Sequence, residues 1–270
     1  MGWCSESQAL ERQGASKEIR VCARSEQEAS KKCLWRFSRA LRDSEIAKKH
    51  SKVKGHQGGG VVSETRIVDR DLQIFREIDR WRVVLGRHIA ELVGFTGIRA
   101  CDQRLSKLIS AGYIERRKIL YGIPSIYSLT SKAKILASLP ARTEKIRVEQ
   151  IPHDIAVLDT AIYFHKLKEV PYGDMTTEKQ LHSLDGFGTR KHRPDLIINR
   201  NGKSYCIEVE LSLKAKSRLE AIIQDNFMQF DHQIWIVPDK SCKIYQILAD
   251  NQAQFTSIHI LELQEVQKND

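Results

Sequence analysis

Residues 193–210, RPDLIINRNGKSYCIEVE, carry the strongest fold signal in the chain. Two apolar runs flank Asn201-Gly202, a dipeptide that favours a two-residue turn between antiparallel strands. Because side chains alternate along a strand, Glu208 and Glu210 share one face. A tight turn also brings Asp195 across to the region of Glu208. The sequence therefore predicts a β-hairpin in which three carboxylates lie close together.

Such a cluster of like charges is costly unless one carboxyl group keeps a proton or a cation binds. Mg²⁺ is held through carboxylates and retains several waters. A metal of this kind polarises a phosphoryl oxygen and activates water, which is the chemistry of phosphodiester cleavage. We therefore expect Asp195, Glu208 and Glu210 to bind Mg²⁺ or Mn²⁺. The alternative is that the two glutamates are solvated residues on an exposed face.

The residues around this hairpin predict a mixed α/β unit over 151–270 in the order helix, strand, strand, strand, helix, strand. Pro152 suits the start of a helix that continues over 153–166. The run QIWIV predicts a buried strand at 233–237. The remaining expected elements are strands at 174–182, 193–199, 203–211 and 255–263, and helices at 215–230 and 241–249.

Residues 62–140 show helical periodicity followed by a basic hairpin. We expect helices at 69–81, 85–93 and 98–111, the third capped by Thr96, then strands at 113–117 and 125–129 and a closing helix at 131–139. Three short helices and a basic hairpin are the layout of a winged helix-turn-helix, in which the third helix enters the major groove of DNA.

The candidate DNA contacts are polar and basic residues in three groups, each with a plain alternative as a solvated face or an exposed loop. A winged helix can also dock onto another protein. The groups are Arg99, Gln103, Arg104 and Lys107 on the third helix; Arg116, Arg117 and Lys118 on the hairpin; and Arg190, Lys191 and Arg193 before the acidic cluster.

Charge divides the chain. Its net charge is +10, yet residues 151–270 carry 14 basic and 17 acidic side chains, so the excess lies in the first half. Residues 1–61 form a basic arm and 141–150 a polar connector. A basic first half indicates a polyanionic partner. The six cysteines form no C-x-x-C pair, and no apolar run suits a membrane helix or a secretory signal, so we expect a cytoplasmic protein without a membrane partner.

The phrasing LISAGYIERR … YSLTSKAKIL resembles winged-helix regulators. RPD … EVE resembles the PD-(D/E)XK restriction-endonuclease-like nucleases, with Asp195 and Glu208 at the motif acids. Glu210 stands where the motif usually has Lys, a residue that positions the attacking water. Lys214 or Lys216 is a candidate for the missing positive charge.

A narrower resemblance covers about 62–240. PHDIAVLDT, TTEKQL, RPDLII and IEVELSLKAKSRL resemble the replication-relaxation proteins, which include the MobC-type relaxases of mobilisable plasmids. The resemblance adds Glu178 to the acidic site and marks His153 at the helix start, where the alternative is capping or packing. Asp154 is a further candidate acid.

These features predict a DNA-binding, metal-dependent endonuclease of a mobile element. By the resemblance it nicks one strand of double-stranded DNA at a plasmid transfer or replication origin, alongside other mobilisation or replication proteins during conjugation. Two alternatives remain open: a DNA-binding regulator or replication accessory protein without catalysis, and a restriction-type enzyme that cuts both strands.

Overall fold

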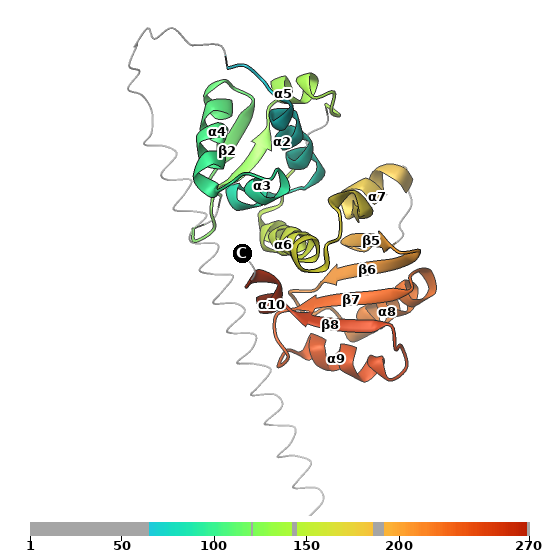
Figure 1. Cartoon of the computed structure of the whole chain (residues 1–270). Coiled ribbons are helices and arrows are strands. Elements are labelled where there is room, and N and C mark those ends of the chain that lie inside the picture. The colour runs from blue at the N-terminus through green and yellow to red at the C-terminus, as the bar shows by residue number, and fades with distance from the viewer. Residues whose placement is uncertain (1–64, 120, 142–144, 186–191, 269–270) are drawn as a thin grey trace, which may run out of the picture. The chain divides into compact units, whose positions relative to one another are not determined.

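The computed structural model describes residues 65–119, 121–141, 145–185 and 192–268 (Figure 1). The predicted basic arm at 1–61 lies outside them. The described residues within Ser63–Ile119 and Ile123–Asp270 cluster as one compact unit. This unit has a mixed α/β fold with helices and two separate sheets.

The first sheet has three antiparallel strands in the order β1-β3-β2. Helices precede and follow its strands along the chain. In chain order the elements are α2 (Asp69–Arg80), β1 (Val84–Leu85), α3 (Gly86–Leu92), α4 (Ile98–Ser110), β2 (Ile114–Arg117), β3 (Ile126–Leu129) and α5 (Ser131–Leu136).

The three predicted helices and the hairpin of this part are confirmed, and two details are wrong. Gly97, not Thr96, is the N-cap of α4, and no side chain caps that helix. The closing helix ends at Leu136, because the backbone reverses at Ser138, whose φ is 54°. The strand β1 was not predicted, since two residues are too few to show alternation.

The second sheet has five strands in the order β4-β5-β6-β7-β8. Strands β4 to β6 pair antiparallel, and β6, β7 and β8 pair parallel. In chain order the elements are α6 (Ile151–Lys168), β4 (Met175–Thr177), α7 (Glu178–Asp185), β5 (Leu196–Arg200), β6 (Lys203–Val209), α8 (Lys216–Gln229), β7 (His232–Val237), α9 (Lys243–Gln252), β8 (Ile258–Glu262) and α10 (Leu263–Gln267), with short 3₁₀ turns at Val148–Gln150 and Tyr172–Asp174.

The predicted hairpin is confirmed. Leu196 pairs with Ile207 and Arg200 with Lys203. Asn201 and Gly202 both have positive φ, 52° and 73°. Two successive residues in this region make the turn whose twist matches that of the flanking strands. The turn therefore sets the register of the whole hairpin.

The predicted strand at 174–182 is wrong beyond Thr177. The chain turns into helix α7 at Glu178 because Thr177 and Gln180 cap it reciprocally. The Gln180 backbone N–H donates to Thr177 Oγ1 at 3.3 Å, and the Thr177 N–H donates to Gln180 Oε1 at 2.9 Å. This is a capping box, which satisfies backbone donors at a helix start.

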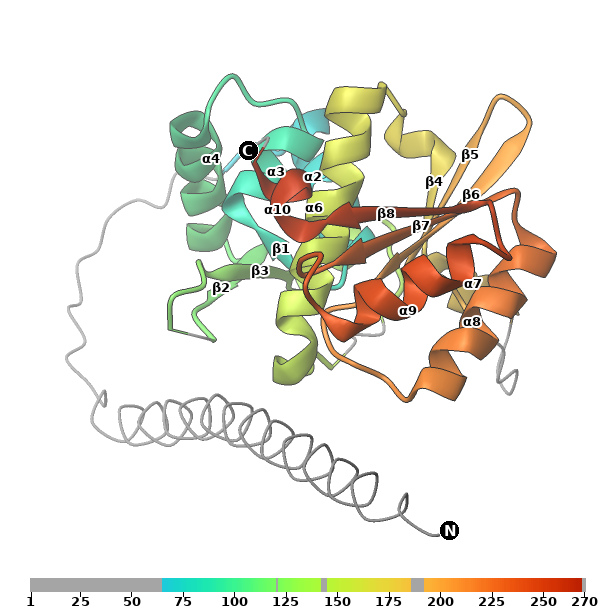
Figure 2. The same ribbon diagram turned by 90° about the horizontal axis from the view of Figure 1, so that it is seen from below.

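The second sheet lies between helices (Figure 2). Helix α6 packs its apolar residues against Ile207, Val209 and other strand residues in one buried cluster, whereas α8 and α9 form another with Trp235 and Val237. On α8 the buried stripe includes Asn226, while Phe227 is 43% exposed.

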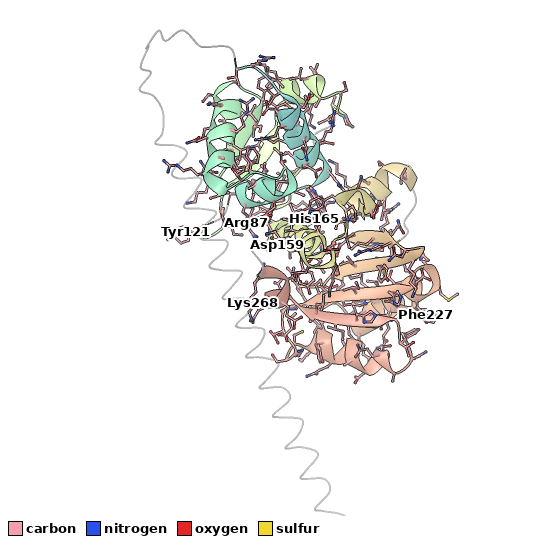
Figure 3. All side chains as sticks on the ribbon, in the orientation of Figure 1. Arg87, Tyr121, Asp159, His165, Phe227 and Lys268 are labelled. Atoms are coloured by element: carbon pink, nitrogen blue, oxygen red, sulfur yellow. The ribbon has the colours of Figure 1, made fainter. Side chains whose placement is uncertain are left out.

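The core under α6 continues into the helices of the first sheet. At its centre the buried Asp159 of α6 accepts hydrogen bonds from three side chains. Figure 3 labels Asp159 and one of these donors, Arg87. Arg87 and His88 of α3 donate to Oδ1 at 2.6 and 2.8 Å, and Gln267 of α10 donates to Oδ2 at 3.1 Å. One carboxylate of α6 thus links α3 in the first half of the unit and α10 near its C-terminal end.

Candidate functional site

Asp195 and Glu208 lie opposite each other at the end of the β5–β6 hairpin. Asp195 directly precedes β5, one step beyond the pair formed by Leu196 and Ile207. The Val209 N–H donates to Asp195 Oδ2 at 2.8 Å. The expected approach of these two carboxylates therefore follows from the strand register.

Glu208 is almost fully buried, at 5% exposure. His192 Nε2 donates to its Oε1 at 2.6 Å, and Asn226 Nδ2 of α8 donates to the same oxygen at 2.9 Å. Burial and the negative charge of Asp195 raise the pKa of Glu208, against the lowering effect of His192 and Asn226. His192 in turn has a raised pKa, because the contact with Glu208 outweighs burial.

Glu210 follows the end of β6 and is 4% exposed. Its N–H donates to the Ile236 carbonyl at 2.9 Å, which extends the parallel pairing with β7. The Lys214 ammonium forms an ion pair with Glu210 Oε2. A buried carboxylate needs such a partner, because an unpaired charge there is expensive. Lys216 instead pairs with Glu220 at 3.7 Å.

His153 stands in the first turn of α6 and contacts the same site. Its Nε2 lies 3.3 Å from Asp195 Oδ2, and its Nδ1 lies 3.8 Å from Asp154 Oδ1. Burial alone lowers the pKa of His153, but the contacts with Asp154 and Asp195 outweigh it and raise the pKa to about 10. The imidazole is therefore a cation at neutral pH.

Arg82, between α2 and β1, joins two further acids to this site. Its guanidinium lies 3.2 Å from Asp154 Oδ1 and 3.3 Å from Glu178 Oε2. Glu178 also lies 3.4 Å from His182. A cavity of about 40 Å³ is lined by Arg82, His153, Asp154, Glu178 and Asp195. Asp154 Oδ2 is buried there with no hydrogen-bond partner in the structure.

The donor set at the hairpin fits a hard divalent cation. Among the described residues, nothing donates to Asp195 Oδ1 or Glu208 Oε2, so each carboxylate keeps one oxygen for a ligand. The described residues contain no group of three or more His, Cys, Asp or Glu side chains arranged to hold a metal. The structure therefore does not group the expected ligands Glu178 and Glu210 with Asp195 and Glu208. One or two carboxylates with waters suffice for Mg²⁺, so a site at Asp195 and Glu208 is compatible with this finding.

Comparison of the chain with protein-family models, curated proteins and solved structures gave no match.

Three residues of this site were not singled out as site residues from the sequence. The fold brings His192 and Arg82 to this site, and no local sequence pattern predicts their contacts there. Asn226 does carry a signal. It continues the helical spacing of Leu219, Ile222 and Ile223, so a polar residue on that buried stripe indicates a specific partner.

A second candidate surface is the outer face of α4. Arg99, Gln103 and Lys107 are exposed on it. Arg104, expected beside them, is held elsewhere: its Nε donates to Asp71 Oδ1 at 2.7 Å and its Nη2 to the Arg66 carbonyl at 2.9 Å. The prediction of a DNA contact at Arg104 is therefore corrected to a structural role.

The β2–β3 hairpin presents Arg116, Arg117 and Lys118 to solvent. Arg117 forms an ion pair with Glu115 on the same strand. Arg193 lies next to His192 and near the acidic site in sequence, whereas Arg190 and Lys191 lie outside the described residues.

Within the described part of the chain, no helix combines the length and apolar character that crossing a bilayer requires.

Proposed function

We propose that this protein is a metal-dependent DNA endonuclease of a mobile element, a relaxase-like nickase with a winged-helix reading module and a PD-(D/E)XK-like nuclease module. The observation that carries the proposal is the hairpin pair. Asp195 faces Glu208 across the strand register, and Glu210 follows with the Lys214 ammonium on its carboxylate. The order of α6, β4, β5, β6, α8 and β7 supports the same nuclease resemblance.

The residues of the site have separate roles in the proposed reaction. Asp195 and Glu208 would hold the cation, and each has one carboxylate oxygen already engaged by the protein. When bound, Mg²⁺ or Mn²⁺ would polarise a phosphoryl oxygen of the DNA and activate a water molecule. The Lys214 ammonium forms an ion pair with Glu210, the residue at the position of the motif lysine. A positive charge therefore lies at that end of the site. His192 and Asn226 fix the orientation of Glu208.

DNA recognition falls to the first sheet and its helices. The layout of three helices and a β-hairpin supports a winged helix, with α4 in the major groove and the β2–β3 hairpin on the backbone. Arg99, Gln103 and Lys107 project from the exposed side of α4. Arginine and glutamine side chains in this position read guanine and adenine edges.

The test is conversion of supercoiled plasmid that carries the DNA flanking the coding sequence, with Mg²⁺, Mn²⁺ or EDTA. We expect metal-dependent open-circular product that is lost in Asp195→Asn and Glu208→Gln. Asp225→Asn is the matched control, because Asp225 is an exposed acid of α8 beside the buried Asn226. Linear product would indicate a double-strand cutter.

A DNA-binding regulator is the second candidate, and the replacement of the motif lysine by Glu210 favours it. A regulator binds one DNA site equally well with or without metal, and Asp195→Asn leaves that binding unchanged. Tight binding without any product, with either metal, would contradict the nuclease proposal and support this one.

A further inference from the structure

A cleft lies between the β2–β3 hairpin and the elements that border the acidic site. Its volume is about 370 Å³, and its walls come from α2, β3, the connector after α5 and the start of α7. Five of its lining side chains are cationic and one is acidic: Arg82, Arg117, Lys134, Lys145, Lys179 and Asp79. Three of these cations have acidic partners: Arg117 pairs with Glu115, Lys179 with Asp79, and Arg82 with Asp154 and Glu178. The exposed Lys145 therefore supplies positive charge that attracts a polyanion to the cleft.

The cleft lies next to the small cavity lined by Asp154, Glu178 and Asp195. Trp81, Arg82 and Lys179 line both this cleft and the smaller cavity that contains His153 and Asp195. Arg82 marks the transition, because it contacts Asp154 and Glu178 on the acidic side. An anionic chain that lies along the cleft therefore passes close to the cavity that Asp195 lines.

We propose that this cleft binds the backbone of single-stranded DNA and leads that strand from the β2–β3 hairpin to the acidic site. The inference rests on the proposed function and deepens it by naming the path of the strand. The volume is at the lower end of the range for small-molecule sites. It accommodates a nucleotide or two and excludes a double helix, which the exposed face of α4 accepts instead.

Substitution of Lys145 distinguishes single-strand binding in the cleft from duplex binding at α4 and the β2–β3 hairpin. It is exposed, belongs to the connector and lies outside α4 and the β2–β3 hairpin. A phosphate contact on a single strand contributes a slope of about 0.7 to the dependence of log affinity on log salt. At 0.1 M salt that slope corresponds to about a fivefold change in affinity.

The experiment measures fluorescence anisotropy of labelled dT20 and of a labelled 20-base-pair duplex with the full chain in EDTA. We expect Lys145→Gln to weaken dT20 binding about fivefold at 0.1 M salt and to lower the salt slope by about 0.7, with the duplex affinity unchanged. Lys145→Glu should weaken dT20 binding further. Lys203→Gln is the matched control, because it removes the same charge from the far end of the β5–β6 hairpin.

Unchanged dT20 binding in both Lys145 variants would overturn the proposal. Equal weakening of dT20 and duplex, or equal weakening by Lys203→Gln, would also overturn it, because the effect would then be general electrostatics. The readout needs no metal and no cleavage. A chain that never nicks DNA but loses single-strand affinity through Lys145 would refute the nuclease and retain the cleft.

Discussion

Replacing Arg104 by alanine tests whether the structure has assigned this residue correctly. The Asp71 side chain is fully buried, and the Arg104 side chain is 22% exposed. Besides Arg104, Asp71 accepts the Val68 N–H at 2.8 Å, where α2 begins. Arg104→Ala therefore leaves a buried carboxylate with a single backbone donor.

Removing one partner of a buried ion pair costs about 3–5 kcal/mol, because the remaining charge is uncompensated. The retained Val68 N–H and the access of water past the truncated side chain place this case near the lower end. We expect a loss of about 3 kcal/mol in the free energy of unfolding. For a chain of this size that loss lowers the melting temperature by roughly 6–12 °C.

Urea and thermal unfolding measure the effect, with Arg99→Ala as the control. Arg99 is exposed on the same helix, so its removal should change stability by less than about 0.5 kcal/mol and weaken DNA binding instead. Asp71→Ala/Arg104→Ala should be less destabilised than the sum of the two single variants. An Arg104→Ala protein as stable as the wild type but deficient in DNA binding would refute the reasoning.

Three further predictions follow from the site and the hairpin. Lys214→Ala should lower nicking by roughly 100-fold, the order found on removal of one transition-state donor, and should leave DNA binding unchanged. Lys216→Ala should change neither nicking nor DNA binding. Equal losses of nicking in the two variants would contradict the assignment of Lys214. Because the pKa of His153 is raised to about 10, its contacts stabilise the fold fully below pH 6.5 and cease to do so as the pH rises through about 10. The difference in urea midpoint between wild type and His153→Gln should follow that course, and a difference that grows with pH would be inconsistent with it. Gly202→Ala should lower stability by about 1–2 kcal/mol, since Gly202 has a φ of 73°, and an unchanged urea midpoint would argue against strain there.

Short-range patterns in the sequence predicted the pairing at the centre of the site. A two-residue turn at Asn201-Gly202 fixes which residues face each other, so the approach of Asp195 to Glu208 followed from counting along the strands. The helices of the first half followed similarly from their helical periodicity.

The errors also have local reasons. Thr177 and Gln180 form a capping signal that the sequence contains, yet strand propensity of the two threonines masked it, and Glu178 was placed on a strand. Arg104 shares its spacing with the exposed residues of α4, and only the buried Asp71 on another helix draws it away.

Other contacts were beyond any local pattern. Arg82 lies 72 residues from Asp154 and 96 from Glu178 along the chain. His88 and Asp159 are separated by 71 residues. Such contacts depend on how the elements of the first half pack against α6 and α7, which the sequence of either part alone does not specify.

The hydrogen bonds that converge on Asp159 limit which parts of this protein can be exchanged for those of another. A chimera that keeps α3 but takes its second half from another protein leaves Arg87 and His88 without their acceptor. The buried His88 keeps the bond from the Leu85 N–H to its Nδ1, but its Nε2 loses its acceptor inside the shared core. Under the proposed DNA-binding function, new specificity is therefore more accessible through substitutions on the outer face of α4 than through exchange of one half of the molecule for another.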